Sequence, residues 1–413
     1  CAAATTAHAQ LTAFPGAEGF GALVTGGRGG NVYIVTNLND SGPGSFRDAV
    51  SQSNRTVVFE VGGTININSQ LVFSNNITVF GQTAPGGIAL YGRGVSLSNR
   101  NNVIVQHMTF RQGINSPSGE KAVNITGGHN MIFDHVSMSW GRWDTLGMTG
   151  NSSNITLQNS IISEAIDPQR LGGLIDAATN ITLARNLWIN NQSRNPKGKG
   201  DLQFINNVIY NWGSNGYVGG HSSAPWKQDL INNYVIAGPS SSLGSSHTQF
   251  TDTDRVYHAG NLLDLDRNGV LDGRALLDSD FRGNSAGDAP TFVAAPQNFP
   301  TVPVSMMSAA EAYDWVLANA GNPRYRDPVD QRVVGHAQSL GMLGAIINNE
   351  GMVGGAPLIT GLAPPLDTSR DGIPDYFKIQ NGFGIHDVIH NVNSGNGYTW
   401  LERYAHSLLD ATL

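Results

Sequence analysis

The chain has 413 residues, of which only 13% are charged and 51 are glycine. Its formal net charge of −7 argues against a nucleic-acid-binding protein, whose surface is normally basic. Cys1 is the sole cysteine, which excludes an internal disulfide and a cysteine-based zinc site. No apolar run approaches the roughly 20 residues that a membrane helix needs, so we expect no membrane partner.

The first nine residues are rich in alanine and threonine. Ala7-His8-Ala9 fits the small-x-small pattern of a signal-peptidase site. Residues 1–9 are therefore interpreted either as the remnant of a signal peptide or as a disordered start. The first alternative predicts a secreted, extracellular protein.

Short β-like runs recur roughly every 20 to 28 residues along the middle of the chain, which is the range of solenoid repeats. Many of these runs begin at an asparagine, and a second run follows each of them after a short gap. An asparagine often stands in the gap, where it tolerates a left-handed backbone and can bond the next coil. The gap residues are Asn159, Asn186, Asn207, Asn233 and Asn261.

This repeat predicts an all-β fold, a right-handed parallel β-helix over residues 10–300. Residues 45–50 are expected to form a short helix that caps the first coil, as solenoids require. The repeat stops near residue 300, so residues 301–413 are predicted to be a partly helical extension packed on the β-helix. Within it, a capping box at Ser308 and Glu311 opens a helix that continues to about Asn319, and residues 398–409 form a final helix.

A series of short motifs occurs in a fixed order between residues 14 and 265. They include Gly26-Gly27-Arg28-Gly29-Gly30, Thr83-Ala84-Pro85-Gly86-Gly87, Phe133-Asp134-His135, Ser139-Trp140, Ser193-Arg194-Asn195-Pro196 and Asn206-Asn207-Val208-Ile209-Tyr210-Asn211-Trp212-Gly213. In this order they resemble the pectate lyases of polysaccharide lyase family 1. The resemblance implies a parallel β-helix that cleaves polygalacturonate, an acidic plant cell-wall polysaccharide, by β-elimination, usually with calcium.

β-Elimination needs a base near the C5 proton of the uronate and a cation against its carboxylate. The resemblance assigns the base to Arg194, although an arginine normally holds its proton above a pH of about 12. It assigns substrate binding to the basic residue five positions later, Lys199, with Lys197 as the competing choice. Arg170 is a weaker candidate for the lysine that the family takes from the preceding coil.

The expected calcium site departs from the family pattern. Lys121 stands where the family has an aspartate, and Trp143 occupies another ligand position. Asp144 remains as a candidate ligand, and the other carboxylates nearby are Glu120, Glu164 and Asp167. Two hypotheses stay open: calcium bridges the substrate to Asp144 and its neighbours, or Lys121 and Arg142 replace the metal, as cationic residues do in pectin lyases.

Aromatic residues near these motifs are candidates for sugar contact. Trp140 and Trp143 are the expected pair, because a tryptophan ring can stack on a sugar face. His129, His135 and His221 are interpreted as structural.

Two acidic loops have the spacing of calcium-binding loops. The stronger one contains Asp264, Asp266, Asn268 and Asp272, with Ala275 in place of the glutamate of an EF-hand. The weaker one runs from Asp367 to Asp375. Each loop is either a structural calcium site or a plain acidic turn.

Three other functions were compared with a calcium-dependent pectate lyase. A glycoside hydrolase needs paired catalytic acids, and the chain has no adjacent aspartates. A metal-independent pectin lyase, or a lyase for another polyuronate, is the alternative within the same chemistry. A non-catalytic carbohydrate-binding β-helix is the alternative of another class. The protein is expected to act as a monomer.

Overall fold

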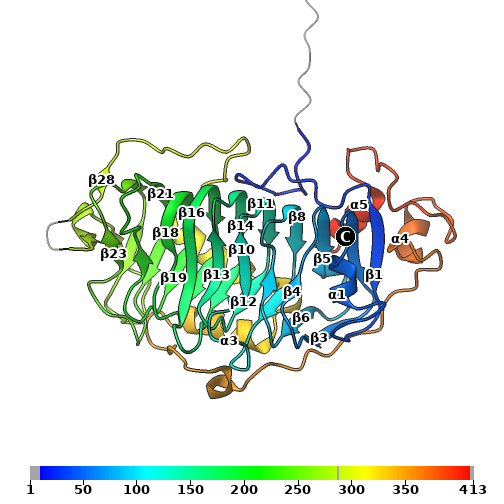
Figure 1. Ribbon diagram of the computed structural model, residues 1–413, viewed down its shortest axis with the longest axis horizontal. Coiled ribbons are helices and arrows are strands. Elements are labelled where there is room, and N and C mark those ends of the chain that lie inside the picture. The colour runs from blue at the N-terminus through cyan, green and yellow to red at the C-terminus, as the bar shows by residue number, and fades with distance from the viewer. Residues whose placement is uncertain (1–9, 286–287, 410–413) are drawn as a thin grey trace, which may run out of the picture.

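A computed structural model describes residues 10–285 and 288–409, so the prediction for residues 1–9 lies outside the described residues. The chain winds into stacked coils, and most coils contribute three short strands (Figure 1). Strands of successive coils pair in parallel, with β25 and β26 as the antiparallel exception among the named pairs. The parallel β-helix predicted from the repeat is therefore confirmed.

The strands fall into three stacks, one for each side of the coil. The first stack consists of β1 (Asn31–Val35), β2 (Arg55–Phe59), β5 (Ile77–Phe80), β8 (Asn101–Gln106), β11 (His129–Asp134), β14 (Ser153–Gln158), the second halves of β16 (Leu171–Ala184) and β18 (Lys197–Ile205), β21 (Lys227–Ile231), β24 (Arg255–Ala259) and β28 (Thr291–Phe292).

The second stack consists of β4 (Leu71–Val72), β7 (Val95–Ser96), β10 (Val123–Thr126), β13 (Asp144–Thr149), the first halves of β16 and β18, β20 (Tyr217–Val218), β23 (His247–Phe250) and β27 (Phe281–Gly283). The third consists of β3 (Gly63–Asn66), β6 (Ile88–Tyr91), β9 (Thr109–Arg111), β12 (Ser137–Ser139), β15 (Ile161–Ser163), β17 (Leu187–Ile189), β19 (Val208–Tyr210), β22 (Tyr234–Ile236), β25 (Leu262–Asp264) and β26 (Arg274–Ala275).

The core is built from columns of apolar side chains, one from each coil. In the first stack one column follows the parallel register and is fully buried; its members are Ile77, Val103, Met131, Ile155 and Ile181. Each such side chain contributes about 1.5–3 kcal/mol through burial. The repeat is thus the sequence of a core that grows by one layer per coil.

Asparagine side chains form the expected ladder between coils. Asn207 donates through Nδ2 to Asn233 Oδ1 at 3.2 Å, and Asn233 donates to Asn261 Oδ1 at 2.9 Å. Asn186 donates to Asn207 in the same way, at 3.0 Å. The prediction for Asn159 needs a correction, because it lies one position earlier, in the left-handed region at φ 54°, and donates to Asp134.

Short helices close or cover the β-helix. The predicted capping helix is α1 (Phe46–Val50), whose buried face packs on the first coils. The capping box at Ser308 and Glu311 opens α2 (Ala309–Asn319) as expected. The final helix α5 (Trp400–Ser407) is shorter than predicted and begins after its own capping box at Thr399. Two helices were not predicted, α3 (Pro328–Gln338) and α4 (Asp375–Gln380).

After β28 the chain runs back along the outside of the coils, so that α5 lies near β1 and β5 (Figure 1). Helices α2 and α3 pack on apolar side chains of the third stack. Among the described residues, no helix combines the length and apolarity that a membrane crossing would require. Four 3₁₀ turns complete the fold: η1 (Gly81–Thr83), η2 (Asp278–Asp280), η3 (Pro323–Tyr325) and η4 (Glu350–Val353).

Candidate active site

The second stack brings together basic residues from several coils. Asp144 begins β13 and pairs in register with Leu171, which in turn bridges to Ser193. Arg194 therefore lies two coils away from Asp144 at the same level of the stack. The strand after Arg194 carries Lys197 and Lys199, whose alternation with glycine puts both side chains on one face.

Arg194 and Asp144 form an ion pair at the centre of this face. Arg194 Nη1 donates to Asp144 Oδ1 at 2.8 Å. The Asp144 side chain is fully buried, and burial raises its pKa although Arg194, Lys121 and Lys197 oppose that shift. Its second oxygen, Oδ2, has no hydrogen-bond partner among the residues described. The carboxylate thus anchors the arginine while the rest of the guanidinium stays accessible to a ligand.

Lys197 is the most perturbed base of the group. It is buried, and burial together with the charges of Arg194 and Lys199 lowers its pKa to about 8. Each ring nitrogen of His221 lies 3.2 Å from Lys197 Nζ. Burial and the nearby lysine lower the pKa of His221 as well. Near neutral pH the ammonium therefore faces an uncharged imidazole.

Two more lysines complete the cationic face. Lys199 pairs with Asp176 on the neighbouring strand, with 2.9 Å between Nζ and Oδ1. Lys121 precedes β10, and its side chain crosses over Gly147 of the next coil. A Cβ at position 147 would lie 2.5 Å from Lys121 Cδ, so the glycine leaves this path open.

The resulting face holds four cations, Lys121, Arg194, Lys197 and Lys199, against two carboxylates. This surplus is unusual in a chain with a net charge of −7. Arg194, Lys197 and Lys199 share one coil, and Lys121 lies three coils before it, with neighbouring coils spaced by about 4.8 Å along the stack. The arrangement suits an extended polyanion that carries a negative group on each unit.

Trp140 and Glu164 do not belong to this face, which corrects two predictions. Trp140 is fully buried in a cluster with Ile166 and with Val329 and Ile347 of the extension. Its Nε1 donates to Glu164 Oε2 at 3.2 Å. Arg332 of α3 also binds the Glu164 carboxylate, through Nη2 at 2.9 Å. Glu164 therefore neutralises an arginine of the extension and cannot serve as a metal ligand at the cationic face.

The other predicted ligands are also engaged elsewhere. Glu120 accepts from Ser116 Oγ at 2.7 Å, away from Asp144. Arg142 is held by backbone carbonyls, with its Nε 3.0 Å from the oxygen of Asp167. The Asp167 carboxylate pairs at 3.3 Å with Arg170.

Two predicted substrate contacts differ in how they are placed. Arg170 also donates to Asn348 Oδ1 of the extension at 3.1 Å, so its guanidinium is directed to that segment. Trp143 is 36% exposed and directly precedes Asp144, which leaves its ring free for a ligand. Of the two tryptophans, only Trp143 is placed for sugar contact.

Two residues of this face were not predicted to be functional: Asp176 was not singled out, and His221 was interpreted as structural. Asp176 could have been found by counting along the repeat, because β16 and β18 place it opposite Lys199. His221 follows β20 with φ at 32°, a backbone state that no local pattern announced.

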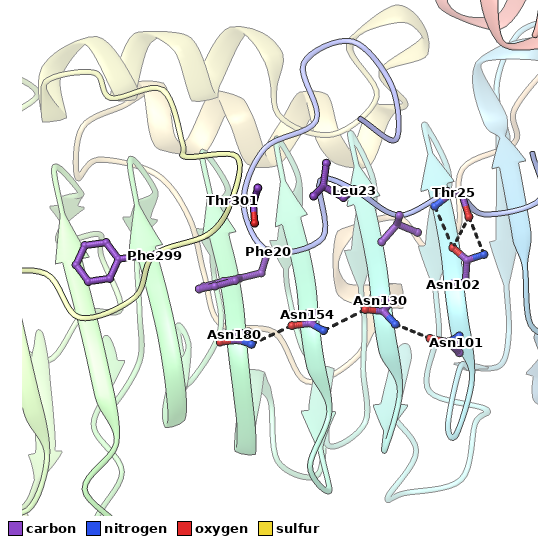
Figure 2. Close-up of a pocket in the computed structure, with 12 residues that line it drawn as sticks. Phe20, Leu23, Thr25, Asn101, Asn102, Asn130, Asn154, Asn180, Phe299 and Thr301 are labelled. Atoms are coloured by element: carbon purple, nitrogen blue, oxygen red, sulfur yellow. Dashed lines mark hydrogen bonds between the residues drawn. The ribbon is translucent and has the colours of Figure 1, made fainter. Parts of the chain in front are cut away.

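A separate hollow, lined by none of these cations, lacks this chemistry (Figure 2). It has a volume of about 620 Å³ and runs along the turn that carries Asn101, Asn130, Asn154 and Asn180, whose side chains bond one another. Its remaining lining residues are Asn102 and residues that are glycine, threonine or apolar. No acid or base lines it, so proton transfer is not expected there.

A histidine cluster is similarly unsuited to catalysis. His107, Asp134 and His135 bring ligand atoms within 4.8 Å of one another. The two imidazoles are parallel within 5°, with centroids 4.8 Å apart. Ring nitrogens bind a metal in the plane of the ring, and two parallel planes cannot share one ion. The cluster is a buried stack of the kind expected for a structural His135.

The residues of the cationic face do not fit a calcium ion held by the protein. Calcium takes six to eight oxygen ligands, usually with several carboxylates. Asp144 is the carboxylate nearest to the expected position, and Arg194 already holds it at 2.8 Å. Lys121 adds a positive charge beside it. The chemistry of this donor set is that of an anion site.

Comparison with known proteins gives a consistent result. No family model matches the chain. The chain is 45% identical over 416 residues to "Probable pectate lyase C" of Neosartorya fischeri, an alignment that covers 100% of this chain and 97% of that protein. A thermostable pectate lyase, PL 47, has a similar fold, with a TM-score of 0.55 over 74% of this chain and 97% of that one at 15% identity. A pectate lyase bound to a hexasaccharide matches with a TM-score of 0.51 over 78% and 100% of the two chains, at 17% identity.

Proposed function

Since this chain belongs to the pectate lyase family and is a polysaccharide lyase, we propose that it cleaves polygalacturonate by β-elimination at the cationic face of the second stack. The observation that carries this proposal is the set of Arg194, Lys197 and Lys199 on neighbouring positions, joined by Lys121 from three coils before. Free carboxylates along the polymer match this charge. A methylated pectin would leave most of it without a partner.

The reaction needs a base near C5 and positive charge against the carboxylate, both from the cationic face. The C5 proton is removed, its bonding electrons form the C4–C5 double bond, and the C4–O bond breaks, with a water proton going to the leaving oxygen. Negative charge builds up on the adjacent carboxylate during this step. Preorganised cations stabilise such charge strongly in a site that excludes water. In this chain Lys197 and Lys199 are placed for that role.

Arg194 is proposed as the base at C5. Its ion pair with Asp144 fixes its orientation. Asp144 acts as a positioning residue that contacts the arginine and not the sugar. Trp143, exposed beside Asp144, is proposed to contact a sugar ring.

Pectate lyases are generally calcium-dependent. Because the residues of the cationic face do not fit a calcium ion held by the protein, no step of this mechanism passes through a metal. We propose that Lys121, Lys197 and Lys199 neutralise the substrate carboxylate in its place. Arg142 does not share this role, since its guanidinium is bound to backbone carbonyls.

The site of action is proposed to be extracellular. The substrate is a cell-wall polymer, and a secreted monomer can reach it directly. We further propose that residues 10–300 carry the active site and that residues 301–413 support it. Arg332 of that extension binds Glu164, and Asn348 accepts a hydrogen bond from Arg170.

The test is an absorbance assay for the unsaturated product on polygalacturonate, with methylated pectin as the second substrate. Arg194→Ala should reduce kcat/KM by about 10²- to 10⁴-fold. The assay is run at a temperature where the variant is folded, because loss of the partner of buried Asp144 should lower the melting temperature. Arg403→Ala is the matched control, because Arg403 is exposed on α5, which lies near β1 and away from β13 and β18 (Figure 1). Full activity in Arg194→Ala would refute the assignment of the base.

Two further outcomes separate the alternatives. Tight binding of polygalacturonate without any product would favour a non-catalytic carbohydrate-binding protein. Chelator should leave activity at 25 °C unchanged. If chelator abolishes activity while the protein stays folded, calcium acts at the cationic face. The proposal that lysines neutralise the substrate carboxylate in its place is then wrong.

A further inference from the structure

The cations of the cationic face differ in how each is held in place. A carboxylate holds Arg194, since Asp144 Oδ1 lies 2.8 Å from its Nη1. A carboxylate also holds Lys199, whose Nζ lies 2.9 Å from Asp176 Oδ1. Such a carboxylate fixes the cation, but its own negative charge offsets the attraction that the cation exerts on a bound anion.

Lys197 is held by an uncharged ring instead. Its Nζ lies 3.2 Å from each ring nitrogen of His221. Within residues 10–285 and 288–409, no carboxylate forms an ion pair with this lysine. A neutral imidazole can accept a hydrogen bond without offsetting the charge of the ammonium. Lys197 therefore keeps its full charge while its position is fixed.

His221 is fixed in turn by Gln249 of the next coil. The backbone amide of His221 donates to the carbonyl of Gln249 at 3.0 Å. The Nδ1 atom of the ring lies 3.1 Å from Gln249 Oε1. Val218 and Thr248 pair in register shortly before these two residues, so β20 and β23 hold both sides of the contact.

The two partners of the ring determine which of its nitrogens carries the proton. The oxygen of Gln249 can only accept, so Nδ1 of His221 donates to it. An ammonium can only donate, so the lone pair of Nε2 accepts from Lys197. The neutral form with its proton on Nδ1 satisfies both contacts. A charged imidazolium would leave the ammonium without an acceptor, and Lys197, Lys199 and Arg194 all disfavour that charge.

We propose that His221 is a positioning residue that holds the ammonium of Lys197 against the substrate carboxylate next to C5. Lys197, and not Lys199, is then the cation that stabilises the negative charge that develops there. A cation that is already in place needs no reorganisation when this charge appears. Lys199, paired with Asp176, serves to bind the polymer. These roles rest on the proposed β-elimination.

Two substitutions of His221 separate positioning from packing. His221→Leu keeps a side chain of similar size but removes the acceptor, so kcat on polygalacturonate should fall about 10- to 100-fold. KM should change little, because the charge on the carboxylate grows only in the transition state. The amide of His221→Gln can accept from Lys197 and donate to Gln249, so this variant should regain most of kcat. His386→Leu, at an exposed histidine that follows α4, is the matched control.

Three results would overturn the proposal. The first is a kcat of His221→Leu at the wild-type level. The second is an equal loss of kcat in His221→Leu and His221→Gln, which would assign the effect to packing of the ring. The third concerns the two lysines: Lys197→Met should lower kcat more than it raises KM, and Lys199→Met should do the reverse. The opposite pattern would assign the reacting carboxylate to Lys199.

A measurement without substrate separates this contact from the proposed function. Nitrogen NMR of the wild type near neutral pH should show His221 uncharged, with its proton on Nδ1, and Lys197→Met should shift the Nε2 signal. A charged ring, or a proton on Nε2, would overturn the contact. A wild type with the expected tautomer but without any unsaturated product would refute the proposed function and the catalytic role of Lys197, and leave only the contact standing.

Discussion

Lys378, which is buried against the acidic loop from Asp367 to Asp375, allows a quantitative prediction about stability. Lys378, Asp367 and Asp371 have side chains that are 0%, 6% and 1% exposed. Lys378→Met keeps the length of the side chain but removes its charge. Two buried carboxylates are then left to repel each other in a site with little water.

The cost follows from the contacts that remain. The backbone amides of Gly372 and Ile389 still donate to the two carboxylates at 2.8 Å each, so neither aspartate is left bare. Removal of one partner from a buried ion pair costs about 3–5 kcal/mol. For a chain of this length, that corresponds to a fall in melting temperature of about 4–6 °C.

Urea denaturation and calorimetry measure this loss directly. Lys227→Met, a substitution of an exposed lysine on β21, is the control and should change stability by less than about 0.5 kcal/mol. Lys378→Met/Asp371→Asn should regain part of the loss, because one of the unpaired charges is gone. A loss below about 1 kcal/mol in Lys378→Met would refute the reasoning from buried charge.

Two further predictions concern the cationic face and the asparagine ladder. As pH rises through about 8, Lys197 loses its charge, so kcat/KM for polygalacturonate should fall; Lys197→Arg should remove this fall, and an identical pH profile would contradict the role of Lys197. Asn207→Ala leaves the carbonyl of Leu183 and the amide of Asn186 without their partners on Asn207, so urea denaturation should show a loss of about 2–4 kcal/mol; a loss under 1 kcal/mol would show that the ladder adds little.

The repeat and the helix caps were readable from the sequence because both are local. A coil must present apolar residues inward at fixed intervals, so its strands recur in the sequence as they recur in space. The capping box at Ser308 and Glu311 closes within one turn of helix, and the structure forms it as predicted. The basic residues Arg194, Lys197 and Lys199 were found for the same reason, since one segment carries all three.

Contacts between coils and with the extension were decided by the tertiary structure. Coil lengths vary, so the pairing of Asp144 with Arg194, 50 residues away, depends on the register of two coils and not on any spacing within one. Trp140 is buried because Val329 and Ile347 of the extension pack on it, while Trp143 stays exposed.

The fate of the acidic residues shows the same limit most clearly. Glu164 looked like a metal ligand until Arg332, 168 residues later, was found to bind it. The two acidic loops, residues 264–272 and 367–375, share the spacing of their polar residues, yet Lys378 forms ion pairs with only the second. The sequence by itself determined the repeat, the helix caps and the basic cluster. Which carboxylate is neutralised by an arginine, by a lysine or by nothing was decided by packing over long distances, because charge compensation acts through space.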